Sequence, residues 1–221
     1  MSDQVYISRG VITLPATWEN KTPRIVPIRP LGKGMFTKAY VTTQQRKPTV
    51  YLVTEDQVYD KEILREISRN TSSKHLPRVE EVGYTHNATV YRMPLYHSPL
   101  RKGESPQAWA QYQVLRQCWK EADELVYGRS RWNRNIWDGH KLINAVVECA
   151  RHRKLPRGLV RALKLLQDTS GNYGSTYSFE FSPRNLATDD KGNLILLDVL
   201  FNQENVMKKA GRRGLAVRRY R

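Results

Sequence analysis

The sequence predicts an α+β protein of two lobes, a small antiparallel sheet followed by a helical lobe into which a β-hairpin is set. Three observations lead to this fold class. Short strand-like runs dominate the first part of the chain, stretches of helical periodicity follow, and a polar turn flanked by apolar runs interrupts the helical part near its end. A chain of 221 residues can bury one good core or two small ones.

The sheet lobe is expected to begin after residues 1–23, a mixed N-terminal extension in which no periodicity is long enough to assign an element. A helical stretch over residues 56–69, in which Tyr59, Ile63 and Ile67 recur at intervals of four, interrupts the strands. The strands are expected at residues 25–28, 36–42, 49–53, 79–84 and 89–93.

The helical lobe is expected to begin with Ser105-Pro106, because serine caps a helix and proline suits its first turn. Helices are predicted over residues 106–127, 139–153 and 157–167. A hairpin is predicted at 186–188 and 194–197, around the turn Asp189-Asp190-Lys191-Gly192-Asn193. The chain therefore divides into the extension, a sheet lobe over 24–95, a helical lobe with the hairpin over 96–207, and a basic tail over 208–221.

The net charge of +16, from 37 Lys and Arg against 21 Asp and Glu, attracts polyanions such as nucleic acid, an acidic protein surface or nucleotide phosphates. The two cysteines, Cys118 and Cys149, have no metal-ligand or redox spacing, which fits a reduced compartment. No apolar run approaches the roughly 18 residues of a membrane span, and the N-terminus lacks the apolar region of a signal peptide. A cytoplasmic protein without membrane contact is predicted.

A glycine loop, Gly32-Lys33-Gly34-Met35-Phe36, lies between the first two predicted strands. Because glycine has no Cβ, the backbone N–H groups of such a loop can approach phosphates closely. Two glycines at this spacing also form ordinary tight turns, so the motif alone leaves both interpretations open.

The residues that flank the hairpin are the candidate metal ligands. Asn185 precedes its first strand and Asp198 follows its second, and a hairpin returns the chain beside its own start. Both side chains supply hard oxygen donors, which suit Mg²⁺ when phosphate oxygens and water complete its octahedron. The alternative is that both residues only cap loop ends.

The order of these features resembles the protein-kinase superfamily over residues 24–205. The resemblance implies a two-lobed protein-kinase-like fold that binds ATP and Mg²⁺. It places Glu180 at the position of the catalytic base and Asn185 and Asp198 on the metal. The residues implied at the nucleotide are Gly32, Lys33, Gly34, Phe36, Glu62 and Met93.

A narrower resemblance is to the early host-takeover protein kinases of the T-seven-group (autographivirus) bacteriophages. It rests on the loop pattern G-x-G-x-F-x-x-A-Y, on Trp137-Asp138-Gly139, on a hairpin that ends in Asp-Val and on the basic C-terminal region. It implies a Ser/Thr protein kinase that acts on host proteins in the host cytoplasm. Since only 23 residues follow Asp198, we expect a fold truncated after the metal-binding Asp, without a separate regulatory domain.

Two positions depart from the kinase pattern. The strand that usually supplies a phosphate-pairing lysine reads Thr-Val-Tyr-Leu-Val-Thr over residues 49–54, so Glu62 has no obvious partner. Strand alternation favours Lys33 over Lys38 as a substitute, unless both are surface charges. Glu180 stands where the family has Asp, and its extra methylene predicts a reduced rate. Asp198 keeps the metal ligand of the D-F-G motif without its Phe and Gly.

Positive charge mixed with tryptophan offers a second kind of binding site. Residues 128–141 combine Arg and Lys side chains, which neutralise phosphates, with tryptophan rings, which stack on nucleobases. Tryptophans beside the start of a helix also serve as core anchors, so both interpretations stay open. The tail binds nucleic acid or an acidic protein, or it is solvated and disordered. The candidate residues are Arg129, Arg131, Trp132, Arg134, Lys208, Lys209, Arg212, Arg213, Arg218 and Arg219.

Three functions follow from these patterns. The first is a minimal phage-type Ser/Thr protein kinase that transfers the γ-phosphate of ATP to host proteins, and the retained Asn185 and Asp198 favour it. The second is a weak or inactive pseudokinase that acts as a basic binding module and inhibits a host protein or nucleoprotein machine, and the missing strand lysine favours it. The third is a small-molecule phosphotransferase with the same cleft.

Overall fold

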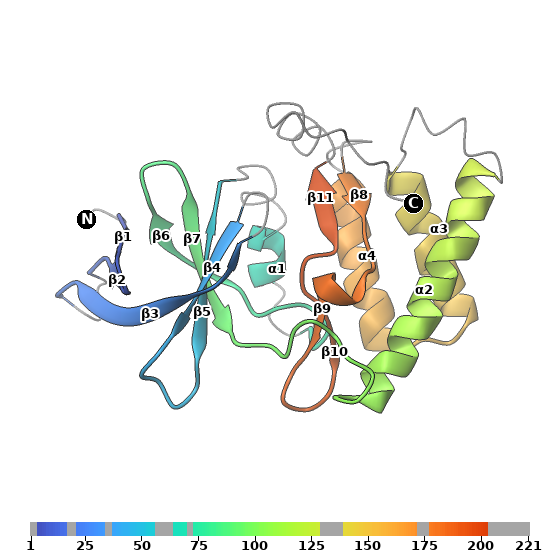
Figure 1. Cartoon of the computed structure of the whole chain (residues 1–221). Helices are drawn as coiled ribbons and strands as arrows, with labels where there is room; N and C mark the ends of the chain where they lie inside the picture. Colours follow the sequence, from blue (N-terminus) through green and yellow to red (C-terminus); the bar gives the residue numbers. More distant parts are fainter. Residues whose placement is uncertain are drawn as a thin grey trace, which may run out of the picture. The chain divides into compact units, whose positions relative to one another are not determined.

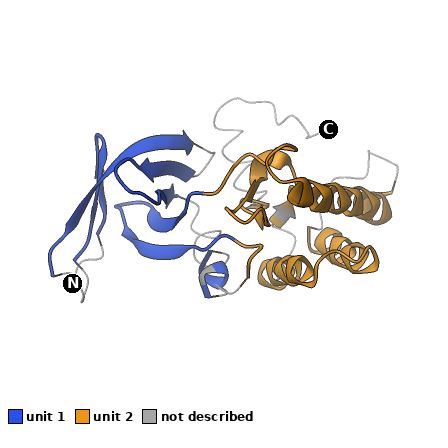
Figure 2. Cartoon of the chain, turned by 90° about the horizontal axis from the view of Figure 1, so that it is seen from below, with its two compact units in different colours: residues 1–72, 77–95 blue, residues 73–76, 96–221 orange. Residues whose placement is uncertain are grey.

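The computed structural model describes residues 4–16, 21–33, 37–55, 64–69, 73–128, 139–171 and 177–202. The chain forms two compact units, coloured separately in Figure 2. Unit 1 contains residues 1–72 and 77–95, and unit 2 contains residues 73–76 and 96–221. The short segment 73–76 thus belongs to unit 2, although it lies between two parts of unit 1 in the sequence.

Unit 1 is built on a seven-stranded antiparallel sheet of order β1-β2-β3-β4-β5-β7-β6 (Figure 1). A short helix, α1 (Arg65–Arg69), packs against β6. The strands are β1 (Tyr6–Ser8), β2 (Val11–Leu14), β3 (Arg24–Lys33), β4 (Thr37–Thr42), β5 (Thr49–Thr54), β6 (Glu80–Tyr84) and β7 (Thr89–Pro94).

The sheet of unit 1 curls until its two ends meet. The Val5 N–H donates to the Tyr84 carbonyl at 2.7 Å, and Gln4 forms a parallel bridge to Tyr84, so the start of the chain adjoins the last strand of the sheet. The apolar side chains on the inner face form one buried cluster. Its members are Val5, Ile12, Leu14, Val26, Ile28, Tyr51 and Val90.

Strands β1 and β2 are the main difference from the predicted architecture of this unit. Residues 1–23 are expected from the sequence to be an extension without an element, yet β1 and β2 pair with each other and β2 pairs with β3. These strands have three and four residues, which is too short for a visible alternation. Only the structure shows that Ile12 and Leu14 face the core while Val11 and Thr13 alternate with them.

Unit 2 has three long helices, α2 (Pro106–Tyr127), α3 (Gly139–His152) and α4 (Arg157–Gly171). Helix α2 begins as predicted, because the Ser105 hydroxyl accepts a hydrogen bond from the Ala108 N–H at 3.2 Å. Helix α4 continues beyond the predicted residue 167, and the hydroxyls of Thr169 and Ser170 donate to carbonyls of its preceding turn. Buried leucines, isoleucines and valines from the three helices form the core of this unit.

Two small antiparallel sheets complete unit 2. The predicted hairpin is present as β9 (Leu186–Thr188) and β10 (Leu194–Leu196). A second pair, β8 (Tyr177–Phe179) with β11 (Leu200–Asn202), was not predicted. Each of these two strands is only three residues long, and their partners are more than twenty residues apart, so neither leaves a local signal in the sequence.

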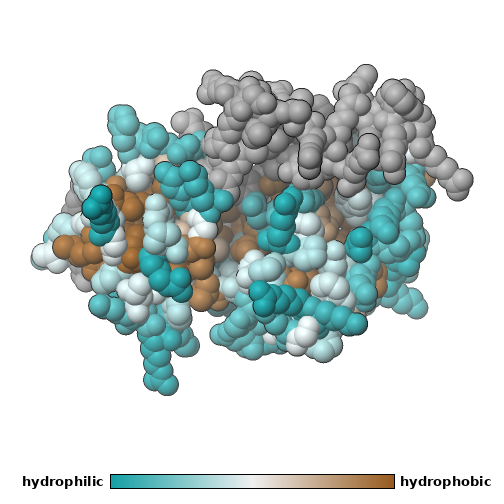
Figure 3. Space-filling model, viewed as in Figure 1, coloured by the Kyte–Doolittle hydropathy of each residue, from teal (hydrophilic) through white to brown (hydrophobic). Residues whose placement is uncertain are grey.

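The structure confirms the predicted α+β fold class, with an antiparallel-sheet unit followed by a helical unit that carries the hairpin. Hydrophilic side chains cover most of the described surface in the view of Figure 3. Every helix in the described part of the chain is too short or too polar to cross a membrane. The predicted helix over 56–69 is described only at its end, in α1, because residues 56–63 lie outside the described ranges.

Candidate functional site

The hairpin of unit 2 brings Asn185 and Asp198 to the same place. The backbone carbonyl of Asn185 accepts hydrogen bonds from the N–H groups of Leu197 at 3.1 Å and Asp198 at 3.0 Å. The pairing of β9 with β10 produces this contact, because it returns residue 197 beside the start of β9. The two candidate metal ligands are therefore neighbours along one edge of the hairpin.

Glu180 is linked to the same edge through its backbone. Its N–H donates to the Val199 carbonyl at 2.9 Å, next to Asp198, and its carbonyl accepts from the Asn185 side-chain amide at 3.4 Å. The Asn185 nitrogen is thus turned toward Glu180, and the oxygen of that side chain is the atom that can ligate a cation. All three predicted catalytic positions lie in one hydrogen-bonded segment.

A single turn of 3-10 helix, η4 (Pro183–Asn185), connects Glu180 to the hairpin. Ser182 precedes it in an extended conformation and Pro183 occupies its first position, where the missing N–H costs nothing. The Asn185 N–H donates to the Ser182 carbonyl at 3.0 Å. The turn therefore sets the short spacing between the carboxylate at 180 and the amide at 185.

The Glu180 side chain forms an ion pair within this segment. Its Oε1 lies 2.8 Å from Nη2 of Arg184, and the two side chains are 32% and 61% exposed. Sequence reasoning missed Arg184, although the spacing of four residues between opposite charges was visible in the chain. Because the turn η4 separates the two residues, that spacing alone did not indicate a contact.

The turn of the hairpin is held by Asp189. Its carboxylate accepts from the Asn193 N–H at 2.8 Å, from the Lys191 N–H at 3.0 Å and from the Asn193 side chain at 2.8 Å. Burial opposes ionisation of Asp189, but these hydrogen bonds outweigh it and lower the pKa of the carboxyl. The Ser105 hydroxyl, which caps α2, donates to the Gly192 carbonyl at 2.9 Å and so ties the turn to the helix.

His75 anchors the second strand of the hairpin. Its Nδ1 lies 2.8 Å from the Leu194 carbonyl, and its own carbonyl accepts from the Leu196 N–H at 2.9 Å. The residue is almost fully buried, and this burial lowers the pKa of the imidazole because it disfavours the charged form. A neutral ring that donates from Nδ1 fits these contacts, and it fixes β10 two residues before Asp198.

Asn185 and Asp198 fit Mg²⁺ by the chemistry of their donors. Magnesium is usually held by one or two protein oxygens, with substrate phosphates and water in the remaining positions. Among the described residues there is no cluster of three His, Cys, Asp or Glu side chains that would form an all-protein metal site. An exposed carboxylate beside an amide is consistent with a cation that arrives together with a phosphate-bearing substrate.

The nucleotide face predicted in unit 1 is less complete. The register places Ala39 opposite Leu52 and Thr37 opposite Thr54, so Leu52 and Thr54 share the face of Ala39. Neither carries a charge. The lysine that the kinase pattern requires on this strand is therefore absent from the face where it would be needed.

The register also bears on the substitute lysines. Lys33 pairs with Lys38, and Lys38 pairs with Val53, which packs against the buried cluster on the other face of the sheet. The two lysines thus share one face, opposite to Ala39, at the ends of their strands. Strand alternation therefore does not favour Lys33 over Lys38 as the substitute for the missing lysine. The roles of Lys33 and Gly32 at a nucleotide stay predictions.

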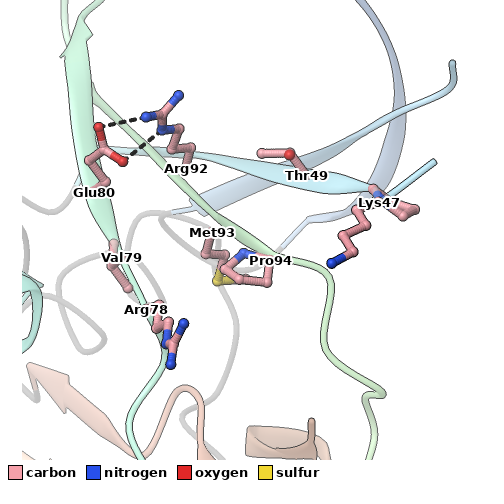
Figure 4. Close-up of a pocket in the computed structure, with 9 residues that line it drawn as sticks. Lys47, Thr49, Arg78, Val79, Glu80, Arg92, Met93 and Pro94 are labelled. Atoms are coloured by element: carbon pink, nitrogen blue, oxygen red, sulfur yellow. Dashed lines mark hydrogen bonds and ion pairs between the residues drawn. The ribbon is translucent and has the colours of Figure 1, made fainter. Parts of the chain in front are cut away.

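Met93 is buried, and it contributes to the lining of an open cavity of about 420 Å³ in unit 1 (Figure 4). Thr49 and Pro94, which pair across β5 and β7, line it as well. Arg92 forms two hydrogen bonds to Glu80, at 2.7 and 2.8 Å. The remaining lining residues are Lys47, Pro48, Arg78 and Val79.

Most of the strand residues that line this cavity lie on the opposite face of the sheet from the predicted nucleotide site. Thr49, Arg92 and Pro94 share the inner face with Tyr51, whereas Ala39 and Leu52 lie on the other face. Met93 pairs with Val50 and shares the Ala39 face by register. This register allows Met93 to face a nucleotide, and its role there stays a prediction.

Several predicted residues lie outside the described ranges. For the nucleotide these are Gly34, Phe36 and Glu62. The basic and aromatic candidates outside the described ranges are Arg129, Arg131, Trp132, Arg134, Lys208, Lys209, Arg212, Arg213, Arg218 and Arg219.

Comparisons with known proteins find weak similarity to solved structures. No family model and no curated protein matches the chain. Solved structures similar to it include spectinomycin phosphotransferase APH(9)-Ia, in complex with ADP and spectinomycin, with 13% identity and a TM-score of 0.38 over 85% of this chain and 68% of that one. Another is aminoglycoside phosphotransferase APH(4)-Ia, with 11% identity and a TM-score of 0.34 over 77% of this chain and 65% of that one.

The chain thus spans about two thirds of the length of each of these two proteins. Both TM-scores are below 0.5, so neither similarity carries a function over to this chain. The functional proposal rests on the residues of the hairpin.

Proposed function

We propose that this chain is a minimal kinase-like phosphotransferase that moves the γ-phosphate of ATP onto a serine or threonine hydroxyl of a host protein. The observation that supports it is the convergence of Glu180, Asn185 and Asp198 on one edge of the β9–β10 hairpin. An acid, an amide and a second acid in this order are the groups that phosphoryl transfer needs for its nucleophile and its metal. The phage-type assignment rests on the sequence motifs alone.

In this proposal each residue has a separate role. The Glu180 carboxylate orients the acceptor hydroxyl and takes its proton as the new P–O bond forms. The amide oxygen of Asn185 and the carboxylate of Asp198 hold Mg²⁺, which when bound neutralises charge on the transferring phosphate. The backbone hydrogen bonds of Asn185 keep these two ligands at a fixed separation, so little reorganisation is needed during the reaction.

The weak element of this proposal is nucleotide affinity. With Leu52 and Thr54 in place of a lysine on the Ala39 face, the phosphates lose a charge-assisted contact. We therefore expect a high KM for ATP. Turnover should also be slow, because Glu180 carries its carboxylate one methylene further from the backbone than aspartate does.

The absence of a lysine on the Ala39 face favours a second candidate function, a pseudokinase that acts as a basic binding module on an acidic or nucleic-acid-containing host machine. A protein that binds but does not transfer needs no lysine at the phosphates. The net charge of +16 supports such a partner.

One experiment separates the two functions. Purified protein is incubated with γ-labelled ATP, Mg²⁺ and a bacterial lysate, beside the variants Asp198→Ala and Asp190→Ala. Asp190 is the matched control, since it lies in the same hairpin and its side chain is 93% exposed beside His97. The kinase proposal expects label on proteins with the wild type and with Asp190→Ala only. Absence of transfer, together with the lack of any thermal shift on adding nucleotide, would overturn the kinase proposal, whereas transfer abolished by Asp198→Ala would overturn the pseudokinase.

A further inference from the structure

The ion pair between Glu180 and Arg184 has a place in the proposed chemistry. Nη2 of Arg184 lies 2.8 Å from Oε1 of Glu180, a distance typical of a charge-assisted hydrogen bond. Both residues belong to the segment that also contains Asn185. The carboxylate that the proposal uses as base is therefore held by a cation only four residues away.

The backbone on both sides of this pair is fixed. The Glu180 N–H is bonded to the Val199 carbonyl, and the turn η4 is closed by the bond from the Leu186 N–H to the Pro183 carbonyl. The Cα atoms of Glu180 and Arg184 are therefore held at a set separation. The fold of the segment thus places the two side chains within reach of each other.

A glutamate at this position needs such a contact more than an aspartate does. Its side chain has one more rotatable bond, and holding a side chain in one rotamer costs conformational entropy. At 32% exposure, packing against neighbours restrains Glu180 only in part. Misplacing a reacting group by about 1 Å can cost about 100-fold in rate.

We propose that Arg184 is a positioning residue, which holds the Glu180 carboxylate in the place where it receives the proton of the acceptor hydroxyl. This inference rests on the proposed function, because it concerns the orientation of its base. In this role Arg184 acts through Glu180. Glu180 and Arg184 together then place a carboxylate where the shorter aspartate of the kinase pattern would place its own.

A purely structural role predicts different behaviour. Ion pairs this exposed contribute little to stability, so loss of Arg184 should barely change folding. The pair between Lys164 and Asp168 in α4 is a matched control, with the same spacing of four residues and the same 2.8 Å distance. If exposed pairs act only on stability, removal of either cation should leave turnover unchanged.

The test measures kcat and KM for ATP in the labelled-phosphate assay for wild type, Arg184→Ala, Arg184→Lys and Lys164→Ala. We expect Arg184→Ala to lower kcat by about 10- to 100-fold, with KM for ATP changed less than about twofold. Arg184→Lys should recover part of the rate, because it keeps the charge without the planar fork of arginine. Lys164→Ala should match the wild type.

A double-mutant cycle completes the test. Glu180→Asp removes a methylene and with it the reach to Arg184, so Arg184→Ala should change kcat less than about twofold in that background. If the losses in kcat from Glu180→Asp and Arg184→Ala multiply in the double variant, the two residues act independently and the proposal is overturned. An Arg184→Ala variant with unchanged kcat would also overturn it, as would one in which KM for ATP alone rises, since the latter is the mark of a residue that binds the nucleotide.

Failure of this inference is distinguishable from failure of the proposed function. A wild-type protein that shows no transfer dependent on Asp198 would overturn both. A wild-type protein that does transfer phosphate, with an Arg184→Ala variant as active as Lys164→Ala, would overturn only the role of Arg184.

Discussion

The hairpin of unit 2 and the Ala39 face of unit 1 keep different amounts of the machinery that phosphoryl transfer requires. Asn185 and Asp198 are both present, and backbone hydrogen bonds hold them together. On the Ala39 face, Leu52 and Thr54 occupy the strand where a lysine is expected. Under the proposed function, this difference means that the cation edge and the phosphate contact can change independently, because they belong to separately built parts of the chain.

The two regions also differ in how their geometry is secured. Hydrogen bonds tie the hairpin to Ser105, which caps α2, to His75 beside β10 and to His97 beside β9, and Asp189 holds its turn together from within. The Ala39 face is fixed mainly by strand pairing. We therefore expect substitutions in the hairpin to affect rate and stability, and substitutions on the Ala39 face to affect nucleotide affinity.

The largest effect is expected for Glu180→Gln, which keeps the size of the side chain and removes its basicity. Phosphate transfer should fall by about 100-fold or more, the usual contribution of a general base. KM for ATP should stay close to that of the wild type, since Glu180 is not assigned to the nucleotide. A variant as active as the wild type would show that Glu180 does not act as the base.

A lysine can be introduced on the Ala39 face to test whether its absence weakens ATP binding. In Leu52→Lys a cation is placed on the Ala39 face at a half-buried position, and hydrogen bonds to charged groups contribute about 1.5–3 kcal/mol, so affinity for ATP should rise about tenfold or more. Leu52→Met is the control for side-chain length without charge. Isothermal titration calorimetry with ATP and Mg²⁺ measures both variants, and equal affinities for the two would contradict the assignment of this face.

Gly192 tests how strongly the hairpin turn is constrained. Its φ of +74° is unfavourable for other residues, and a Cβ there would lie 3.1 Å from the Ser105 hydroxyl oxygen. Gly192→Ala should lower the free energy of unfolding by about 1–2 kcal/mol. Gly103→Ala is the control, because no heavy atom lies within 4 Å of the position that its methyl group would occupy and its φ is ordinary. Urea unfolding that gave equal stabilities for both variants would contradict this account.

The smallest effect is the pH dependence that His75 gives to the hairpin region. Its pKa is lowered in the folded state, so the unfolded chain binds more protons as the pH falls below about 6.5. Its contribution to stability is therefore complete above that pH and is lost on acidification, at no more than about 1.4 kcal/mol per pH unit. His75→Asn keeps a donor for the Leu194 carbonyl and should flatten the dependence of Tm on pH between 7 and 5. An unchanged slope would exclude His75 as its source.

The sequence predicted the parts of the fold that have long periodic patterns or strong turn signals. Helix α2 follows from Ser105-Pro106, and the hairpin follows from the polar turn between two apolar runs. Strands β1, β2, β8 and β11 escaped because they have three or four residues. Such strands exist only through their partners, and pairing between distant segments leaves no local pattern.

The candidate site was predictable to a similar extent. The proximity of Asn185 and Asp198 follows from hairpin geometry alone, and the structure has it. The contact of Arg184 with Glu180 depends on the turn η4, and the anchoring by His75 joins residues 119 positions apart. The first was missed because the local turn that produces it was not predicted, and the second because it depends on tertiary structure.

The proposed function requires the edge formed by Asn185 and Asp198 to hold a divalent cation together with a nucleotide. The most direct measurement is Mn²⁺ binding in the presence of ADP, followed by electron paramagnetic resonance, for wild type, Asp198→Ala and the hairpin control Asp190→Ala. We predict that ADP-dependent Mn²⁺ binding is present in the wild type and in Asp190→Ala, and is weakened at least about tenfold in Asp198→Ala. Equal binding by all three proteins, or no ADP-dependent binding by any, would contradict the claim.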